Sequence, residues 1–123
     1  MRRLIATVSV LMLLVSCSGD ASESGRYQLG EFFISGPARL SDETESVTLE
    51  NVGEFPHTLV VTRPSGQVVA ASGLVQPDET ITLDLTLEPG TYQFTCRIVG
   101  QDSEGQLVDH YERGMHATVS VGG

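Results

Sequence analysis

Residues 80–87 constrain the fold more than any other segment, because polar and apolar side chains alternate along them without interruption. A period of two is typical of a strand that is buried on one face. From Tyr27 onward the chain shows no helical periodicity, and turn-forming residues separate further segments of strand-like composition. Seven or eight short strands at this spacing predict one all-β domain, a Greek-key β-sandwich or barrel. The other expected strands are 27–34, 38–40, 46–50, 57–62, 67–70, 91–96 and 117–121.

The charge distribution argues against nucleic acid as a partner. The 123 residues include 7 basic residues, all of them Arg, and 16 acidic residues, so the formal net charge is −9. Phosphate contacts dominate the affinity for nucleic acids, and an acidic chain without a basic cluster cannot supply them. The sequence also offers no recognisable Ser-His-Asp set and no phosphate-binding loop. We therefore expect neither a nucleic-acid-binding protein nor an enzyme of these types.

Residues 1–16 have the pattern of a bacterial lipoprotein signal peptide. Two Arg residues follow Met1, and the apolar residues 4–15 are too few to span a bilayer. The sequence Leu-Val-Ser-Cys at 14–17 resembles a lipobox. This resemblance implies cleavage before Cys17, lipid on its thiol and acylation of the new N-terminus. An ordinary signal peptide followed by an incidental Cys is the alternative.

The predicted lipidation site marks the start of the mature chain, which we divide into two segments. Residues 17–26 are small, polar and rich in Gly and Ser, so we interpret them as a lipidated, flexible tether. Residues 27–123 then form the domain, which we expect to be a monomer. Two or more acyl chains give stable anchoring. The predicted location is therefore extracytoplasmic, on a membrane at the cell surface or on the periplasmic side.

Sulfur and imidazole donors gather in the second half of the predicted domain. Most of them lie at the ends of the long segment 97–114, which joins the last two predicted strands. A loop of this length is more often functional or disordered than incidental. A thiolate, two imidazoles and a weakly bound thioether form the ligand set of a blue copper site. Within residues 27–123 the donors are Cys96, His110, Met115 and His116, together with His57 earlier in the chain.

At these residues the sequence resembles the cupredoxins, a family of small copper proteins. Residues 51–57, Asn-Val-Gly-Glu-Phe-Pro-His, are similar to the segment with the first His ligand, and the Phe-Pro-His is plastocyanin-like. Residues 90–96 are similar to the strand that delivers the Cys, and residues 110–115 to the His-x4-Met loop that precedes the final strand. The resemblance implies a cupredoxin-like sandwich with one type 1 copper. Its implied ligands are His57, Cys96, His110 and Met115.

The sequence departs from the family pattern between Cys96 and His110, which are separated by thirteen residues. Gln101 stands where His is common in the family, and we interpret residues 101–109 as an insertion before the second His. Because the entropy of loop closure grows slowly with length, a longer loop can still deliver His110. We do not expect His116 to be a ligand, because adjacent residues in a strand face opposite ways.

The resemblance implies a carrier of single electrons at the outer face of a cell membrane. Such a protein has a redox partner protein but transforms no substrate, so we expect that it is not an enzyme. Two other classes stay open: a lipoprotein that binds, buffers or delivers copper, and a metal-free interaction domain. A dinuclear purple copper site would need a second nearby Cys, and a multicopper oxidase would need many more His residues than three.

Overall fold

The computed structural model describes residues 24–122. Every regular element in this part of the chain is a strand, and there are eleven of them. Within residues 24–122 there is no helix with the length and apolar character needed to cross a bilayer. The predicted signal peptide, the predicted lipidation site Cys17 and most of the predicted tether lie outside the described residues.

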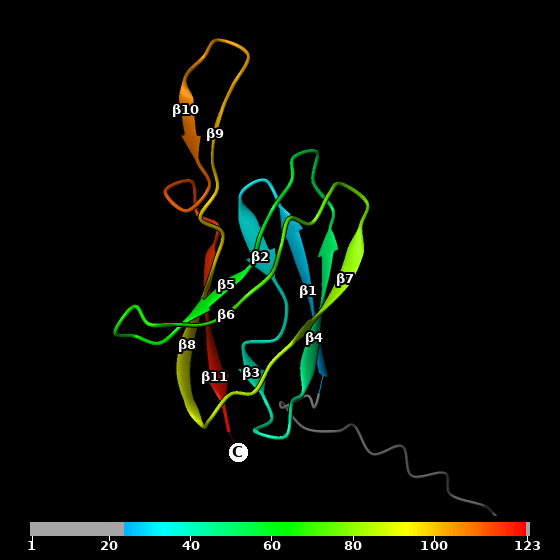
Figure 1. The fold of residues 1–123 in the computed structure, drawn as a ribbon, viewed down its shortest axis with the longest axis vertical. Helices are drawn as coiled ribbons and strands as arrows, with labels where there is room; N and C mark the ends of the chain where they lie inside the picture. The colour runs from blue at the N-terminus through cyan, green and yellow to red at the C-terminus, as the bar shows by residue number, and fades with distance from the viewer. Residues whose placement is uncertain (1–23, 123) are drawn as a thin grey trace, which may run out of the picture.

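Two sheets face each other and form a sandwich (Figure 1). In the four-stranded sheet β1 and β4 are parallel neighbours, paired from Ser24↔Ser46 to Leu29↔Asn51. The two outer strands run antiparallel to them. The spatial order is β2 (Phe33–Ser35), β1 (Ser24–Gly30), β4 (Ser46–Asn51) and β7 (Thr80–Asp84).

The five-stranded sheet has β8 at its centre. This strand pairs antiparallel with β11 on one side and β5 on the other. The two-residue strand β3 pairs parallel with β11, and β6 pairs antiparallel with β5. The spatial order is β3 (Arg39–Leu40), β11 (His116–Val121), β8 (Gly90–Thr95), β5 (Val60–Thr62) and β6 (Val68–Ala71). The prediction of an all-β sandwich is confirmed.

The core lies between the sheets and is formed by the inward residues of each strand. Tyr92 and Phe94 of β8 are buried, and the Phe94 ring lies 5.0 Å from the ring of Tyr27 on the opposite sheet, centroid to centroid. Leu29 and Leu49 are also fully buried. Burial of each such large side chain stabilises the fold by about 1.5–3 kcal/mol. The packed interior holds the strand ends in fixed positions, and the candidate site lies at one of these ends.

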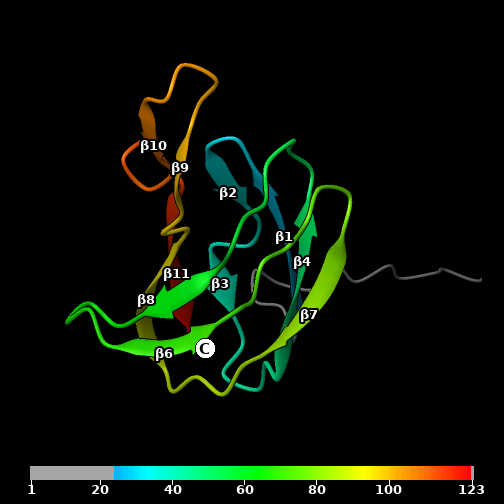
Figure 2. The same ribbon diagram turned by 45° about the horizontal axis from the view of Figure 1, so that its top comes forward.

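A third pair of strands extends beyond the sandwich. β9 (Val99–Gln101) and β10 (Leu107–Asp109) form an antiparallel hairpin that projects from the end at which β8 finishes (Figure 2). It occupies the long segment 97–114, whose length the sequence analysis recognised but whose strands it did not predict. The Asp102 carboxylate accepts hydrogen bonds from the backbone N–H groups of Glu104 and Gln106 at the hairpin tip.

Several predicted strand boundaries are wrong. The segment expected as one strand over 27–34 is two antiparallel strands, β1 and β2, with a turn at Glu31 and Phe32. The strand expected over 80–87 ends at Asp84, although Leu85 and Leu87 remain buried. β1 begins at Ser24, inside the segment that the sequence analysis assigned to a tether.

Candidate metal centre

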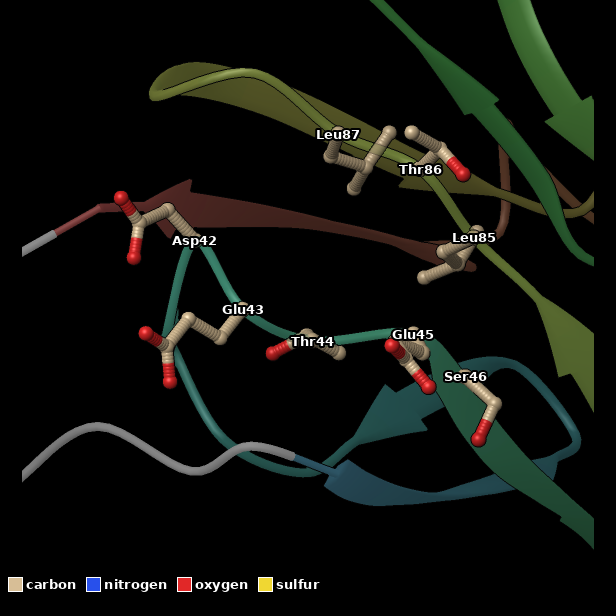
Figure 3. Close-up of a pocket in the computed structure, with 8 residues that line it drawn as sticks. All are labelled: Asp42, Glu43, Thr44, Glu45, Ser46, Leu85, Thr86 and Leu87. Carbon is tan, nitrogen blue, oxygen red and sulfur yellow. The ribbon is translucent and has the colours of Figure 1, made fainter.

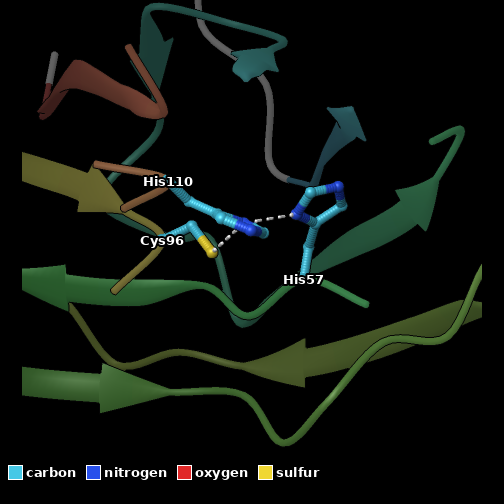
Figure 4. A group of neighbouring side chains, drawn as sticks. All are labelled: His57, Cys96 and His110. Carbon is cyan, nitrogen blue, oxygen red and sulfur yellow. Dashed lines mark hydrogen bonds between the residues drawn. The ribbon is translucent and has the colours of Figure 1, made fainter. Parts of the chain in front are cut away.

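Three buried side chains meet where β8 ends and the hairpin begins. They are His57, Cys96 and His110, whose ligand atoms all lie within 4.8 Å of one another. The Nδ1 atoms of the two imidazoles are 3.2 Å apart, and Cys96 Sγ is 3.6 Å from His110 Nδ1 (Figure 4). The three residues are far apart in the sequence, so the fold brings the three groups together.

The alternation of β8 explains the orientation of Cys96. Tyr92 and Phe94 point into the core, and Cys96 follows two residues later with no exposed surface. Its backbone N–H donates a 3.0 Å hydrogen bond to the carbonyl oxygen of Met115, which fixes the end of β8 against the start of β11. The Thr58 hydroxyl lies 3.8 Å from the sulfur. The thiol is therefore enclosed and held in place.

His57 is positioned by an irregular segment between β4 and β5. Its backbone exchanges two hydrogen bonds with Val75, of 3.1 and 2.8 Å, outside any regular strand. Asn51 organises the turn before it: the buried side-chain amide donates to the carbonyl oxygens of Phe55 and Val75, and its oxygen accepts from the Gly53 N–H. These bonds satisfy backbone groups that the turn would otherwise leave unpaired.

His110 follows the hairpin, and backbone hydrogen bonds hold it on both sides. Its N–H donates to the carbonyl oxygen of Ile98, and its carbonyl oxygen accepts from the Met115 N–H, both at 3.0 Å. The Phe32 ring packs edge-on against the imidazole at a centroid distance of 5.3 Å. The extended segment therefore ends at a fixed backbone position, which explains how thirteen intervening residues still place His110 beside Cys96.

Met115, immediately before β11, and His116, the first residue of β11, lie on opposite sides of the chain. Met115 has no exposed surface, whereas His116 is exposed and its ring packs against Tyr111 at 5.0 Å. His116 is absent from the cluster of donor atoms formed within residues 24–122. The strand period of two therefore separates these adjacent residues, as the sequence analysis expected.

Glu31 is a functional candidate that the sequence analysis missed. It lies in the turn between β1 and β2, and its Oε1 atom is 3.1 Å from His57 Nε2. The same oxygen accepts hydrogen bonds from the backbone N–H groups of Glu54 and Phe55. Burial raises the pKa of Glu31, but the hydrogen bonds from Phe55, His57 and Glu54 outweigh burial and the pKa is lowered.

The hydrogen bonds assign protons to the two imidazoles. An ionised carboxylate only accepts hydrogen bonds, so His57 must carry a proton on Nε2. In neutral His57 the Nδ1 atom then has a free lone pair, which accepts the Nδ1–H of His110. A metal ion bound between them would displace the proton from His110. The lone pair of His57 already points toward that position.

The pKa values favour the forms that bind a metal. Burial by itself raises the pKa of the Cys96 thiol, but hydrogen bonds, among them those from the backbones of Thr58 and Ile98 and from the Thr58 hydroxyl, outweigh it and lower the pKa. Burial lowers the pKa of His110, which favours the neutral imidazole. Metals bind the thiolate and the neutral imidazole, so less energy is needed to deprotonate these ligands.

The donor set fits a single type 1 copper ion. Thiolate sulfur suits Cu(I), and imidazole is acceptable to both copper oxidation states. Transition metals bind these atoms at about 2.0–2.3 Å, so the donors around one ion lie roughly 3.5 Å apart. The 3.2 and 3.6 Å separations are close to that spacing.

Two cavities differ in their relation to these donors. A cavity of about 490 Å³ has His110 in its wall, together with the apolar side chains of Phe32, Phe55 and Ile98. A larger one of about 680 Å³ lies between the β3–β4 segment and the residues after β7, at the opposite end of the sandwich (Figure 3). Its lining includes Glu43 but none of the clustered donors.

The fold is similar to that of solved cupredoxins. A mutant fern plastocyanin is 24% identical, with a TM-score of 0.53 over 78% of this chain and 98% of that one. Rusticyanin from Thiobacillus ferrooxidans is 18% identical, with a TM-score of 0.54 over 86% and 84% of the two chains. A purple cupredoxin from Nitrosopumilus maritimus is 19% identical, with a TM-score of 0.52 over 78% and 97%. No protein-family model and no curated sequence matches the chain.

Proposed function

Because the chain has the cupredoxin fold and gathers a thiol and two imidazoles in its interior, we propose that it is a type 1 copper protein that carries single electrons. The residues that would hold the copper are His57, Cys96 and His110, with Met115 as a weaker ligand. The observation that carries the proposal is the convergence of both Nδ1 atoms and the Cys96 sulfur within 4.8 Å.

Each ligand has a separate role in this proposal. Bound copper supplies a centre that gains and loses one electron. The Cys96 thiolate provides the most covalent bond and fixes the metal at the end of β8. His57 and His110 would also hold the metal through their imidazoles, and the thioether of Met115, buried immediately before β11, would be a weaker ligand that tunes the potential. Each side chain of this set has a role in holding the metal, and none is assigned a role in converting a substrate. The set therefore supports an electron carrier rather than an enzyme.

The rigidity of the site supports rapid electron transfer. Little should move when an electron arrives, because all three donors are buried and their backbones are tied to neighbouring strands or turns. In the described part of the chain no buried side-chain nitrogen or oxygen lacks a hydrogen-bond partner. A closely packed interior resists rearrangement. We therefore expect similar structures for the oxidised and reduced protein.

His110 is the proposed point at which electrons enter and leave. It lies in the wall of the 490 Å³ cavity, whose surroundings include exposed Phe55 and Leu74. An exposed apolar patch beside a functional group is typical of a protein-interaction site. We propose that a redox partner protein docks on this face. The acidic surplus of the chain would favour a partner with a basic surface, and salt would then slow their association.

We further propose that the mature protein is anchored outside the cytoplasm by lipid on Cys17, with residues 17–26 as its tether. The lipobox-like sequence supports this anchor. The test is metabolic labelling with a radioactive fatty acid. The native protein should carry the label and sediment with membranes, and Cys17→Ser should carry none. A native protein found wholly in the soluble extracellular fraction would contradict the anchor.

Electron self-exchange distinguishes a carrier from a copper-handling protein. Line broadening in NMR spectra of mixed Cu(I) and Cu(II) samples measures the exchange rate, with the all-Cu(I) sample as the control. A carrier should exchange rapidly and keep Cu(I) in the presence of a moderate chelator. Slow exchange together with ready loss of Cu(I) would contradict the proposal and support copper buffering or delivery.

A further inference from the structure

The turn between β1 and β2 brings one carboxylate against the back of the candidate site. Glu31 lies there with its side chain about one quarter exposed, and its Oε1 atom faces His57 Nε2 at 3.1 Å. His57 itself is completely buried. The carboxylate therefore touches the imidazole on the side opposite Nδ1, the atom that faces Cys96 and His110.

The Glu31 carboxylate has little freedom to move away. Its Oε1 atom accepts backbone hydrogen bonds of 2.8 Å from Glu54 and 2.9 Å from Phe55, in addition to its contact with His57. Among the ion pairs formed within residues 24–122, Glu31 takes part only in the one with His57. No Arg side chain therefore forms an ion pair with it among the described residues, and its negative charge faces His57 directly.

Gly53 makes room for this arrangement. A Cβ atom at position 53 would lie 2.1 Å from Glu31 Oε1 and 2.6 Å from its Cδ. Real Cβ atoms do not approach other atoms so closely, so any larger residue would displace the carboxylate. The glycine in the segment before His57 therefore leaves a space that the Glu31 side chain fills.

We infer that Glu31 is a positioning residue for the copper site, an inference that rests on the function proposed above. By accepting the Nε2–H of His57, its carboxylate orients the ring and keeps the lone pair on Nδ1, facing the metal position. Carboxylates that hold a ligating imidazole in this way also raise its basicity. The fixed negative charge adds to this effect, because the oxidised site carries one more positive charge than the reduced site and is stabilised more.

The main test is Glu31→Gln, which keeps the shape and an accepting oxygen but removes the charge. The measured quantities are the dissociation constants for Cu(II) and Cu(I), each by competition with a calibrated chelator. Loss of such a partner typically weakens metal binding by about 10–100-fold. We expect Cu(II) affinity to fall by about tenfold more than Cu(I) affinity, which corresponds to a reduction potential roughly 59 mV higher.

Three variants complete the comparison. Glu43→Gln removes one carboxylate at the far end of the sandwich and should leave the ratio of the two affinities unchanged. Gly53→Ala keeps the charge of Glu31 but displaces it, and should change the ratio in the same direction as Glu31→Gln. Gly73→Ala is the matched control, because a Cβ atom at position 73 has no heavy atom within 4 Å.

A measurement on the unmutated, copper-free protein removes any dependence on how the variants fold. Nitrogen-15 NMR should show His57 protonated on Nε2 and unprotonated on Nδ1 at neutral pH. The opposite tautomer would overturn the inference, as would an unchanged affinity ratio in Glu31→Gln. If the unmutated protein binds copper and is blue, either result removes only the role of Glu31. A protein that binds no copper would overturn both this role and the proposed function.

Discussion

Replacing Asn51 with alanine should destabilise the turn that positions His57. The buried amide group makes three hydrogen bonds of 2.7–2.8 Å to backbone groups of Gly53, Phe55 and Val75. Each such bond contributes about 1 kcal/mol net, so the free energy of unfolding should fall by roughly 3 kcal/mol. For a domain of this size, each kcal/mol lowers Tm by about 4–8 °C, so the expected decrease is on the order of 12–24 °C.

The measurement is thermal unfolding of the copper-free protein by circular dichroism. Gln93→Ala is a matched control, because Gln93 also donates an amide hydrogen bond, to the Thr118 hydroxyl at 2.9 Å, but at an exposed position. Surface substitutions of this kind usually change stability by less than about 0.5 kcal/mol. If Tm decreased equally in the two variants, the hydrogen bonds of Asn51 would not be the interactions that stabilise the turn.

Three further predictions concern the donors and the hairpin. His110→Ala should alter the visible spectrum of the copper-loaded protein, whereas His116→Ala should leave it nearly unchanged; the reverse result would mean that His116 is the ligand. Urea unfolding should show that the copper-free protein loses stability as pH falls below 6.5. Because the pKa of His110 is lower in the folded protein, the unfolded chain binds a proton at a pH where the folded protein does not. A stability that does not change with pH would contradict this prediction. Replacing residues 101–107 with Asn-Gly should leave a folded, blue copper protein. The pair Gly100↔Val108 is retained and can flank a two-residue turn. Loss of copper binding would show that the full hairpin is needed to position His110.

Some features of the site could be predicted because they depend on local periodicity. The alternation that buries Tyr92 and Phe94 also turns Cys96 inward. The same period separates Met115, immediately before β11, from His116, its first residue. The sequence spacing between Cys96 and Met115 does not by itself bring them together. Their proximity depends on the pairing of β8 with β11, which no local pattern in the sequence indicates.

Other features could not be predicted, because they depend on contacts between distant segments. Glu31 is an acidic residue in a turn, and nothing in its neighbourhood in the sequence indicates that it contacts His57. The hairpin strands were missed for a different reason. Val99 and Leu107 are exposed, so neither strand has a buried face that would produce a hydrophobic pattern. The sequence revealed only that the connection is long.

Copper binding measured by visible spectroscopy tests the central claim most directly. A soluble form that begins at Ser24, the first residue of β1, should be titrated with Cu(II) while metal content is measured independently. The account predicts one copper per chain and an intense visible band from thiolate-to-copper charge transfer, which Cys96→Ser abolishes because serine lacks the sulfur. A colourless protein that holds one copper per chain would contradict it.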